Sequence, residues 1–448
     1  MLQYVKYYVS LHKKIRGGTA ASIAASVENE VHSGRIQPGS LLPTVRDLGG
    51  RLKVSPATVA AAYKVLRRRG LVTGAGRGGT RVAVHPPSPV AKRARVVAEG
   101  VIDLAGGNPD PALLPPLSMA LGRIGTAPHL YGDPSELRPL MQFIRGEFEA
   151  DGVPGGSLAL VSGALDGIER VLREHLRPGD LVGVEDPSFP GLLDLLASAG
   201  YGRVPIALDD DGPVPASFEE GLRRVRAVII TPRAQNPTGA ALTATRAREL
   251  RLLSRRRPDV LLIENDPCGP VAGAEVHSLA GAGVRHWAVV RSTSKFLGPD
   301  LRLAALAGDE LTIARVEGRQ ALGARWVSTI LQQLALALWA DPGSGRWLAH
   351  AANVYAQRRD ALVSALAAHR ILAHGRSGFH VWIPVREEAA MVQALADRGW
   401  GVMAGERCRI RSAPAIRITT AALLPDAAER LAADLAEIAP MGLLRASG

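Results

Sequence analysis

The stretch RSTSKFLGPDLR, from Arg291 to Arg302, follows an apolar run that ends at Val290. It places Lys295 behind two serines and seven residues ahead of an arginine. A lysine amine can hold an aldehyde covalently, and serine hydroxyls with an arginine fork can bind phosphate. The spacing therefore predicts a site for an aldehyde cofactor that carries a phosphate, formed by Ser292, Ser294, Lys295 and Arg302. Taken alone, the stretch is explained better by a surface lysine in a serine-rich loop, because short motifs often arise by chance.

The surrounding sequence alternates apolar strands with helical patterns from residue 158 onward. Such alternation predicts an α/β body with a mostly parallel sheet, whose functional side chains lie at the carboxyl ends of the strands. Residues 326–369 are expected to be largely helical, and about the last 75 residues to form a smaller C-terminal α+β subdomain. The expected strands are 158–162, 181–186, 204–208, 227–231, 260–266, 287–291 and 303–308.

Length and composition limit the classes of protein. A chain of 448 residues with 47% hydrophobic content can form two or three domains with their own cores. Two cysteines cannot form a disulfide framework, and no CxxC or HExxH pattern predicts a metal site. The apolar runs are shorter than the roughly 18 residues that a membrane helix needs, and the first residues lack an export signal. We therefore expect a cytoplasmic protein without a membrane partner.

The basic charge lies almost entirely at one end. The net charge is +12, yet residues 1–98 hold 17 Lys and Arg against 3 Asp and Glu, a net charge of +14. Residues 99–448 hold 37 basic against 39 acidic residues, a net charge of −2. A basic module joined to a near-neutral one indicates a nucleic-acid-binding head on a separate globular body.

Residues 19–84 show three helical patterns followed by two short strands. The first helix is expected to stop at Gly34, and Thr44 can cap the second. Ser55 is a candidate N-cap for the third, with Pro56 at its first position. This order predicts a winged helix-turn-helix whose 55–69 helix enters the major groove by its N-terminal end.

The third helix divides into two faces. Its inner face would hold Val59, Ala62, Val65 and Leu66, and its outer side Thr58, Lys64, Arg67 and Arg68. The turn between the two strands carries Arg77 and Arg81, and would lie along the DNA backbone or minor groove. A proline-rich linker follows at residues 85–100. It contains three basic side chains that are available to bind DNA phosphates: Lys92, Arg93 and Arg95.

The segment PGSLLPTVRDLGGRLKVSPATVAAAYKVLRRRGLV, residues 38–72, closely resembles the DNA-binding domain of GntR-type regulators. The resemblance covers about 65 residues. An alternative is a winged helix that binds protein, which the head's charge of +14 disfavours. Many relatives carry an arginine where this chain has Ala57, so direct reading of bases is expected to be weaker. The resemblance implies DNA contacts at Arg46, Ser55, Ala57, Thr58, Lys64 and Gly79.

Four further motifs fall at strand ends of the body. Ser162, Gly163 and Ala164 stand where a strand turns into a helix, whose first backbone amides can bind phosphate. Phe189 in DPSFPG can stack on a flat ring, although a core position explains it equally. Asn236 in QNPTG lies in a turn that suits an amide holding a phenolic oxygen. The acidic strand end IENDPCG comes last, before the lysine stretch.

The order SGA, DPSFPG, NPTG, acidic strand end, SxSK and R resembles that of fold-type I pyridoxal-phosphate aminotransferases, over about residues 100–448. The resemblance implies pyridoxal 5'-phosphate (PLP) as the cofactor, bound covalently by Lys295. It also implies that Tyr131 in YGDPSELRPL reaches the partner subunit's phosphate in a homodimer. Arg417 in AIRITTAAL would bind the α-carboxylate of a small amino compound, a task that suits a bidentate guanidinium.

One motif departs from that family. In such enzymes an aspartate at this strand end meets the pyridine nitrogen and keeps it protonated, and a tyrosine shortly after it meets the ring oxygen. This chain instead carries ENDPC at residues 264–268. An ungapped alignment puts Asn265 at the aspartate and Cys268 at the tyrosine, whereas a shift by one residue puts Asp266 there. We favour Asp266 and keep Asn265 as the alternative; the missing tyrosine weakens the case for efficient transamination.

A GntR-like head joined to an aminotransferase-like body resembles the MocR/PdxR-type transcription regulators. The resemblance implies a regulator that binds double-stranded promoter DNA and senses PLP or an amino compound. The alternatives are an aminotransferase with an accessory DNA-binding head, and a body that binds no cofactor. The expected organisation is an N-terminal extension (1–17), a winged helix-turn-helix (18–85), a linker (86–100) and a PLP-binding domain (101–448).

Overall fold

The computed structural model describes residues 15–33, 35–37, 39–68, 71–74, 79–82, 100–125, 127–281 and 283–438. They separate into two compact units, whose described parts are mainly residues 15–82, the head, and residues 100–438, the body. Several predicted features lie outside the described residues: most of the N-terminal extension, the linker up to residue 99, the helix end at Gly34, and Arg77, Lys92, Arg93 and Arg95.

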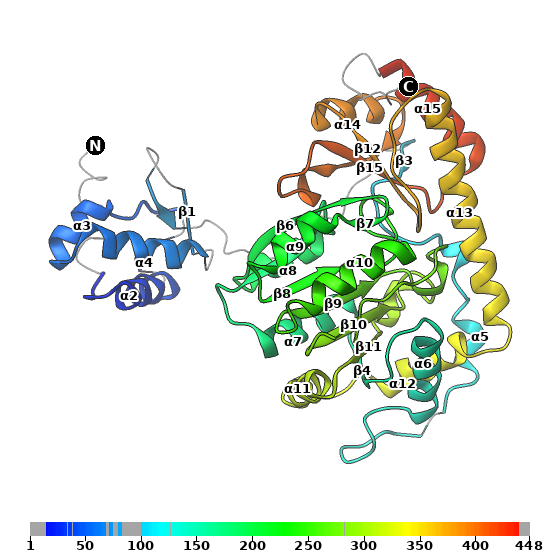
Figure 1. The fold of residues 1–448 in the computed structure, drawn as a ribbon, viewed down its shortest axis with the longest axis horizontal. Helices are drawn as coiled ribbons and strands as arrows, with labels where there is room; N and C mark the ends of the chain where they lie inside the picture. The colour runs from blue at the N-terminus through cyan, green and yellow to red at the C-terminus, as the bar shows by residue number, and fades with distance from the viewer. Residues whose placement is uncertain are drawn as a thin grey trace. The chain divides into compact units, whose positions relative to one another are not determined.

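The head contains three helices and a two-stranded antiparallel hairpin, as the winged helix-turn-helix prediction required (Figure 1). Side-chain caps start the helices: the Thr44 hydroxyl accepts from the Asp47 amide at 3.2 Å, and the Ser55 hydroxyl accepts from the Thr58 amide at 3.1 Å. The elements are α2 (Ala20–His32), α3 (Val45–Leu52), α4 (Pro56–Arg68), β1 (Val72–Thr73) and β2 (Arg81–Val82).

The head has its own hydrophobic core. Val59, Ala62 and Leu66 of α4 are buried as predicted, whereas Val65 is only partly buried. Tyr63 is buried as well, and its hydroxyl donates to the carbonyl oxygen of Pro43 at 2.8 Å, which ties α4 to the turn before α3. The inner face of α4 therefore anchors it and leaves the opposite side to the solvent.

The body is built on an eight-stranded sheet in the order β4-β11-β10-β9-β8-β5-β6-β7. Strands β10, β9, β8 and β5 run parallel to one another, whereas β11 is antiparallel to both β10 and β4. All seven predicted strands are present within two residues of their expected ends. The bounds are β4 (Ser157–Val161), β5 (Leu181–Asp186), β6 (Gly202–Asp209), β7 (Gly212–Pro213), β8 (Ala227–Ile230), β9 (Leu261–Asp266), β10 (Trp287–Ser292) and β11 (Ala304–Gly308).

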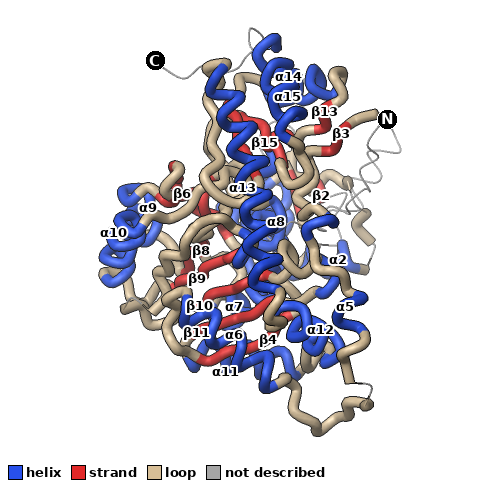
Figure 2. The backbone as a smooth tube through the Cα atoms, turned by 90° about the vertical axis from the view of Figure 1, so that its right-hand side faces the viewer, coloured by secondary structure: helices blue, strands red, loops and turns tan. Residues whose placement is uncertain are grey.

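Helices cover this sheet, and every residue of β8, β9, β10 and β11 is buried. Figure 2 shows β8 to β11 and β4 side by side as a ladder of strands among helices. Helices α7 and α11 pack against β4 and β11. The helices are α5 (Ser118–Leu121), α6 (Arg138–Ala150), α7 (Ala164–His175), α8 (Pro190–Ser198), α9 (Pro215–Leu222), α10 (Ala244–Arg255), α11 (Glu310–Ala321), α12 (Thr329–Trp339) and α13 (Ser344–Ala368).

The C-terminal part forms the expected smaller subdomain, with strand order β12-β15-β14 and a separate pair of β3 with β13. The long α13 packs on both α12 and α15 and so joins the two parts of the body (Figure 1). The elements are β3 (Ile102–Asp103), β12 (His380–Pro384), α14 (Glu388–Ala396), β13 (Trp400–Gly401), β14 (Met403–Ala404), β15 (Ala415–Thr419) and α15 (Pro425–Ile438). Within the described ranges, no helix is long and apolar enough to cross a membrane.

Candidate functional site

Lys295 lies just beyond the carboxyl end of β10 and is half-buried. Its Nζ donates to the carbonyl oxygen of Gly107, a residue far away in sequence, and lies 6.0 Å from the centre of the Phe379 ring. The amine is therefore held at the point where the segment after β3 and the start of the C-terminal subdomain meet the large sheet.

Arg302 and the SGA turn meet as predicted for a phosphate site. The Arg302 Nη2 donates to the carbonyl oxygen of Ser162 at 3.0 Å, and α7 begins with Ala164. Gly163 has a φ of +104°, and a Cβ there would lie 2.5 Å from Arg302 Nη2, so only glycine fits. A guanidinium thus lies beside the positive end of a helix, an arrangement that attracts anions.

The two serines of the lysine stretch turn towards each other. The Ser292 hydroxyl donates to the Ser294 hydroxyl at 2.9 Å and accepts from the Ser294 amide at 3.2 Å. Ser292 is the last residue of β10, and Ser294 precedes Lys295 directly. The stretch therefore forms a tight turn lined with hydroxyl groups at the end of a buried strand.

Arg417 and Asn236 also come together, although 181 positions separate them. The Arg417 Nη1 donates to Asn236 Oδ1 at 3.0 Å, and its Nη2 donates to the carbonyl oxygen of Ala105 at 2.6 Å. A Cβ on Gly107 would lie 3.9 Å from both Arg417 Nη2 and the His380 ring. Because Lys295 donates to Gly107, the predicted carboxylate arginine and the predicted lysine share one neighbourhood.

His380, which the sequence analysis did not single out, belongs to the same neighbourhood. It begins β12, is 5% exposed, and its Nδ1 lies 3.2 Å from the Thr419 hydroxyl. Burial and the positive charges of Arg417 and Lys295 hold the pKa of His380 well below its ordinary value. A histidine inside the apolar run GFHVWIP was the signal that sequence reading overlooked.

Asp266, our preferred partner of the pyridine nitrogen, is fully engaged elsewhere. Arg233 donates to its two oxygens at 3.2 and 2.8 Å, Arg291 donates at 2.9 Å, and the Gly269 amide donates at 3.0 Å. Burial alone would raise the pKa of Asp266, but the charges of Arg233 and Arg291 outweigh it and hold that pKa well below its usual range. Asp151 contacts both arginines and completes a buried ion cluster.

The register of the sheet places Asn265 on the opposite face. Arg291 pairs with Asp266 and Val290 with Asn265 across β10 and β9. Side chains alternate along a strand, so Asn265 shares its face with Ser292, whereas Asp266 shares its face with Arg291. These contacts contradict the preference for Asp266. In the described part of the chain, the buried Oδ1 of Asn265 has no hydrogen-bond partner.

Cys268, at the position aligned with the tyrosine, is buried. Burial raises the pKa of its thiol to about 12, so it stays protonated at neutral pH. A neutral thiol is a weak hydrogen-bond donor and cannot replace a phenol. The departure seen in the sequence is therefore a real difference in the chemistry of this strand end.

Phe189 is half-buried after β5, in the turn that leads into α8. A Cβ on Gly191 would lie 2.7 Å from the Phe189 ring and 3.3 Å from Leu165 in the first turn of α7. The ring is therefore close to the helix start that flanks the phosphate-binding turn. Both the stacking role and the core role remain compatible with this place.

Tyr131 is 79% exposed. Its ring meets the Trp326 ring edge-on at 5.6 Å, and the Arg325 guanidinium lies 4.9 Å from its centre. A pocket of about 350 Å³ adjoins these residues and is lined also by Glu136 and Glu317. Burial and the charge of Glu317 raise the pKa of Glu136 to about 7.

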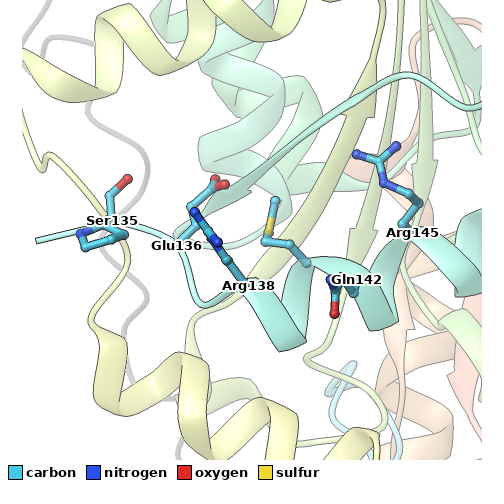
Figure 3. Close-up of a pocket in the computed structure, with 7 residues that line it drawn as sticks. Ser135, Glu136, Arg138, Gln142 and Arg145 are labelled. Carbon is cyan, nitrogen blue, oxygen red and sulfur yellow. The ribbon is translucent and has the colours of Figure 1, made fainter.

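Another pocket, of about 420 Å³, lies at the start of α6, and Figure 3 shows Arg138, Gln142 and Arg145 along that helix beside it. Ser135 and Glu136 line its other end. The residues predicted to bind the cofactor do not line this pocket, and we assign no ligand to it.

The residues predicted to contact DNA are accessible in the head. Arg46, Ser55, Ala57 and Lys64 are exposed, and Thr58 and Gly79 are half-buried. Ser55 also caps α4, so it has a structural role in any case. Gly79 has a φ of +72°, and a Cβ there would lie 2.7 Å from Leu41, which explains the glycine.

The body fits a phosphorylated aldehyde with a polar ring. Arg302 beside the start of α7 suits the phosphate, and Lys295 suits the aldehyde. The buried Oδ1 of Asn265, which has no partner among the described residues, indicates a place for a polar atom of a ligand. These three features, from β4–α7, β9 and β10, lie at the carboxyl ends of neighbouring or nearby strands.

Comparisons with known proteins also divide the chain into a head and a body, because a different family model matches each part. The model of the gntR family of bacterial regulatory proteins matches residues 19–82. The model of class I and II aminotransferases matches residues 123–435.

Two relatives match most of the chain. The vitamin B6 salvage pathway transcriptional repressor PtsJ of Salmonella typhimurium strain LT2 is 40% identical, over 94% of this chain and 98% of that protein. The HTH-type transcriptional regulator TauR of Rhodobacter capsulatus is 26% identical, over 81% of this chain and 83% of its own. Among solved structures, kynurenine aminotransferase from Pyrococcus horikoshii matches with a TM-score of 0.68 at 21% identity, over 77% of this chain and 92% of that one. This last likeness concerns the fold alone.

Proposed function

Because this chain belongs to the MocR/PdxR-type regulators, in which a gntR-family head is joined to a class I and II aminotransferase body, we propose that it is a transcription regulator that binds promoter DNA and responds to PLP. One observation carries the proposal: a single chain holds a capped helix α4 with an exposed outer face, in an N-terminal region (residues 1–98) of net charge +14, and a buried strand end with Lys295 in the body. The proposed domain boundaries stay those expected from the sequence.

In the head, the N-terminal end of α4 would enter the major groove of the promoter. Arg46 and Lys64 would contact phosphates or base edges, because both are exposed cations on the outside of the head core. Ser55, Ala57 and Thr58 would lie at the groove with the first turn of α4. Gly79 would let the hairpin approach the DNA backbone closely.

In the body, Arg302, Gly163 and Ser162 with the start of α7 would hold the phosphate, and Lys295 the aldehyde. Ser292 and Ser294 would add hydroxyl donors, and Phe189 a stacking face. When bound, PLP supplies an aldehyde that a lysine amine can bind covalently and a pyridine ring that accepts electron density. The chain's own residues fix the lysine amine at Gly107 and keep His380 uncharged beside it.

A small amino compound is the proposed second ligand. Arg417 is 4% exposed and donates to Asn236 and Ala105, so its fork is fixed in position before a ligand arrives. A carboxylate would take the place of one of these acceptors. The relative from Salmonella is described as a repressor of vitamin B6 salvage, and we propose that this chain likewise controls genes of vitamin B6 metabolism.

We further propose a homodimer in which Tyr131 serves the partner subunit's phosphate site. Tyr131 is exposed, and its ring contacts Trp326 and Arg325. Exposed apolar side chains on or near α5, α11 and α12 would be covered in the dimer: Leu121 (54% exposed), Leu322 (84%) and Ile330 (54%). Two heads would then bind repeated or palindromic half-sites.

The test uses the purified full-length protein and DNA from upstream of its own gene. We expect binding that weakens steeply with salt and changes when PLP is added, together with an absorbance band for lysine-bound PLP. Lys295→Ala should lose the band. Absence of salt-sensitive binding both with and without PLP would refute the proposal, and a band that persists in Lys295→Ala would refute the lysine assignment.

The alternative is an aminotransferase with an accessory DNA-binding head, and one observation favours it: Lys295, Asn236, Arg302 and Arg417 are all present. Absorbance spectroscopy with added amino acids distinguishes the two. Repeated conversion of the cofactor between its aldehyde and amine forms supports the enzyme. A stable lysine-bound band without turnover supports the regulator.

A further inference from the structure

Asn265, a neutral amide, lies near the carboxyl end of β9, beside the strand that leads into Lys295. It is the next-to-last residue of β9, 9% exposed, on the same sheet face as Ser292 of the lysine stretch. Its Oδ1 is buried and has no hydrogen-bond partner in the described part of the chain. A buried polar atom without a partner destabilises the folded chain, so it points to a ligand group that is bound there.

The carboxylates near this face are engaged elsewhere. Asp266 is directed to the other face and neutralised by Arg233 and Arg291. The register across β5, β8 and β9 places Asp186 on the face of Asn265. Its two oxygens accept from the amides of residues 410, 411 and 412 at 2.6–2.9 Å, and from the Ser412 hydroxyl at 2.8 Å. Neither acid is available to balance a positive charge on a ring nitrogen.

The residues around the site oppose an added cation. Arg302 and Arg417 supply two fixed positive groups, and Cys268 is a neutral thiol. His380 adds no negative charge, and burial together with the charges of Arg417 and Lys295 holds its pKa well below the ordinary value. A ring nitrogen beside Asn265 meets a neutral amide rather than a carboxylate, and a neutral partner does not favour a proton on it.

We propose that Asn265 donates a hydrogen bond from Nδ2 to the ring nitrogen of bound PLP and that this nitrogen stays unprotonated. The side-chain end without a partner is Oδ1, and an unprotonated nitrogen needs a donor; because the two orientations of an amide are nearly equal in shape, the amide can turn over and bring Nδ2 to that place. An unprotonated ring accepts electrons poorly, so the body holds PLP as a ligand to be sensed and transfers amino groups slowly. The inference rests on the proposed function, since it requires that PLP binds at Lys295.

The test measures the ring nitrogen directly. Full-length protein is loaded with PLP labelled with ¹⁵N in the ring, and the ¹⁵N chemical shift is recorded for the parent chain and for Asn265→Asp. We expect the shift of a neutral pyridine in the parent and of a pyridinium in Asn265→Asp. A pyridinium in the parent overturns the proposal, and so does a shift that is the same in both proteins.

A second variant guards against misfolding of Asn265→Asp, since a new buried carboxylate can destabilise the chain before the cofactor binds. Asn265→Leu keeps the approximate volume and removes the donor. We expect it to melt like the parent and to bind PLP roughly tenfold more weakly, as the loss of one buried hydrogen bond predicts. Unchanged affinity in Asn265→Leu means that the side chain does not meet the ring. Absence of any bound PLP in the parent instead refutes the proposed function itself.

Discussion

The head and the body place their functional side chains in opposite surroundings. In the head, Arg46 and Lys64 are exposed on helices whose other side packs a small core. In the body, Asn265, His380 and Arg417 are each at most 9% exposed. Exposed charges act through a field that salt screens, whereas buried polar groups must be matched by a partner or neutralised. Changes in the head should therefore alter binding with little cost in stability, and changes in the body should alter folding as well.

The largest expected effect follows from removing the shared carboxylate of the buried ion cluster. Asp266→Asn leaves Arg233 and Arg291 short of a counter-charge, and we expect the free energy of unfolding to fall by about 3–5 kcal/mol. All six tryptophans follow residue 286, so urea unfolding followed by tryptophan fluorescence reports on the body. The matched control is Asp209→Asn, a half-exposed partner of Arg246, which should change stability by at most about 1 kcal/mol. Equal effects of the two variants would contradict the expectation that a buried ion cluster is more costly to break than a half-exposed ion pair.

The next effect concerns pH. Burial raises the pKa of Glu264 to about 7 from its ordinary value of 4.5. Between these values the folded chain keeps a proton that the unfolded chain has lost, so stability falls as pH rises through this window, by up to about 3 kcal/mol. Glu264→Gln should flatten this part of the pH dependence, measured by the same fluorescence assay.

The control for this variant is Glu220→Gln, at a side chain that is 73% exposed. It should reproduce the parent's dependence on pH. If Glu264→Gln leaves the slope unchanged as well, the carboxyl group does not hold its proton in the folded chain.

A smaller effect is expected from one cation of the head. Lys64→Gln should weaken binding to promoter DNA several-fold and reduce the slope of log affinity against log salt by about one, because one phosphate contact is lost. Arg35→Gln is the control, since it removes the same charge from an arginine that is paired with Glu30. Fluorescence anisotropy at several salt concentrations measures both. A slope that drops equally in the control would assign the effect to net charge alone.

The smallest effect is the loss of one helix cap. Ser55→Ala removes the hydroxyl that accepts from the Thr58 amide, and should destabilise the head by about 1 kcal/mol. Circular dichroism should detect the lower melting temperature of the head, while the tryptophan signal of the body stays unchanged. A shift of the tryptophan transition would show that the two parts unfold together.

Much of this fold could be predicted from the sequence, because each strand of the body is a short apolar run and each head helix begins at a recognisable cap. The roles of the polar residues at the end of β9 could not be predicted in this way. Asn265 and Asp266 are adjacent polar residues on a strand, and neighbouring side chains point to opposite faces, so an alignment shift of one residue exchanges their roles. Only the pairing of β9 with β10 resolves which face each occupies.

His380 was missed for a related reason. Its neighbours in sequence are apolar, and its functional neighbours, Lys295 and Arg417, come from other parts of the chain. The spacing of these residues along the chain does not predict that they lie close together. The predicted site residues that meet in space, Lys295, Arg302, Asn236 and Arg417, were identified because a family resemblance supplied the long-range information that local patterns lack.

The buried ion cluster also constrains the order in which the body can assemble. Arg291 and Asp151, which meet in it, are 140 positions apart in the chain, whereas Arg233 and Asp266 are only 33 apart. During synthesis both Asp151 and Asp266 can meet Arg233 first, but the cluster stays incomplete until Arg291 arrives with β10. Strand β10, which brings Arg291 to the cluster, is followed within three residues by Lys295. Docking of β10 into the sheet therefore completes the ion cluster and positions the cofactor lysine together.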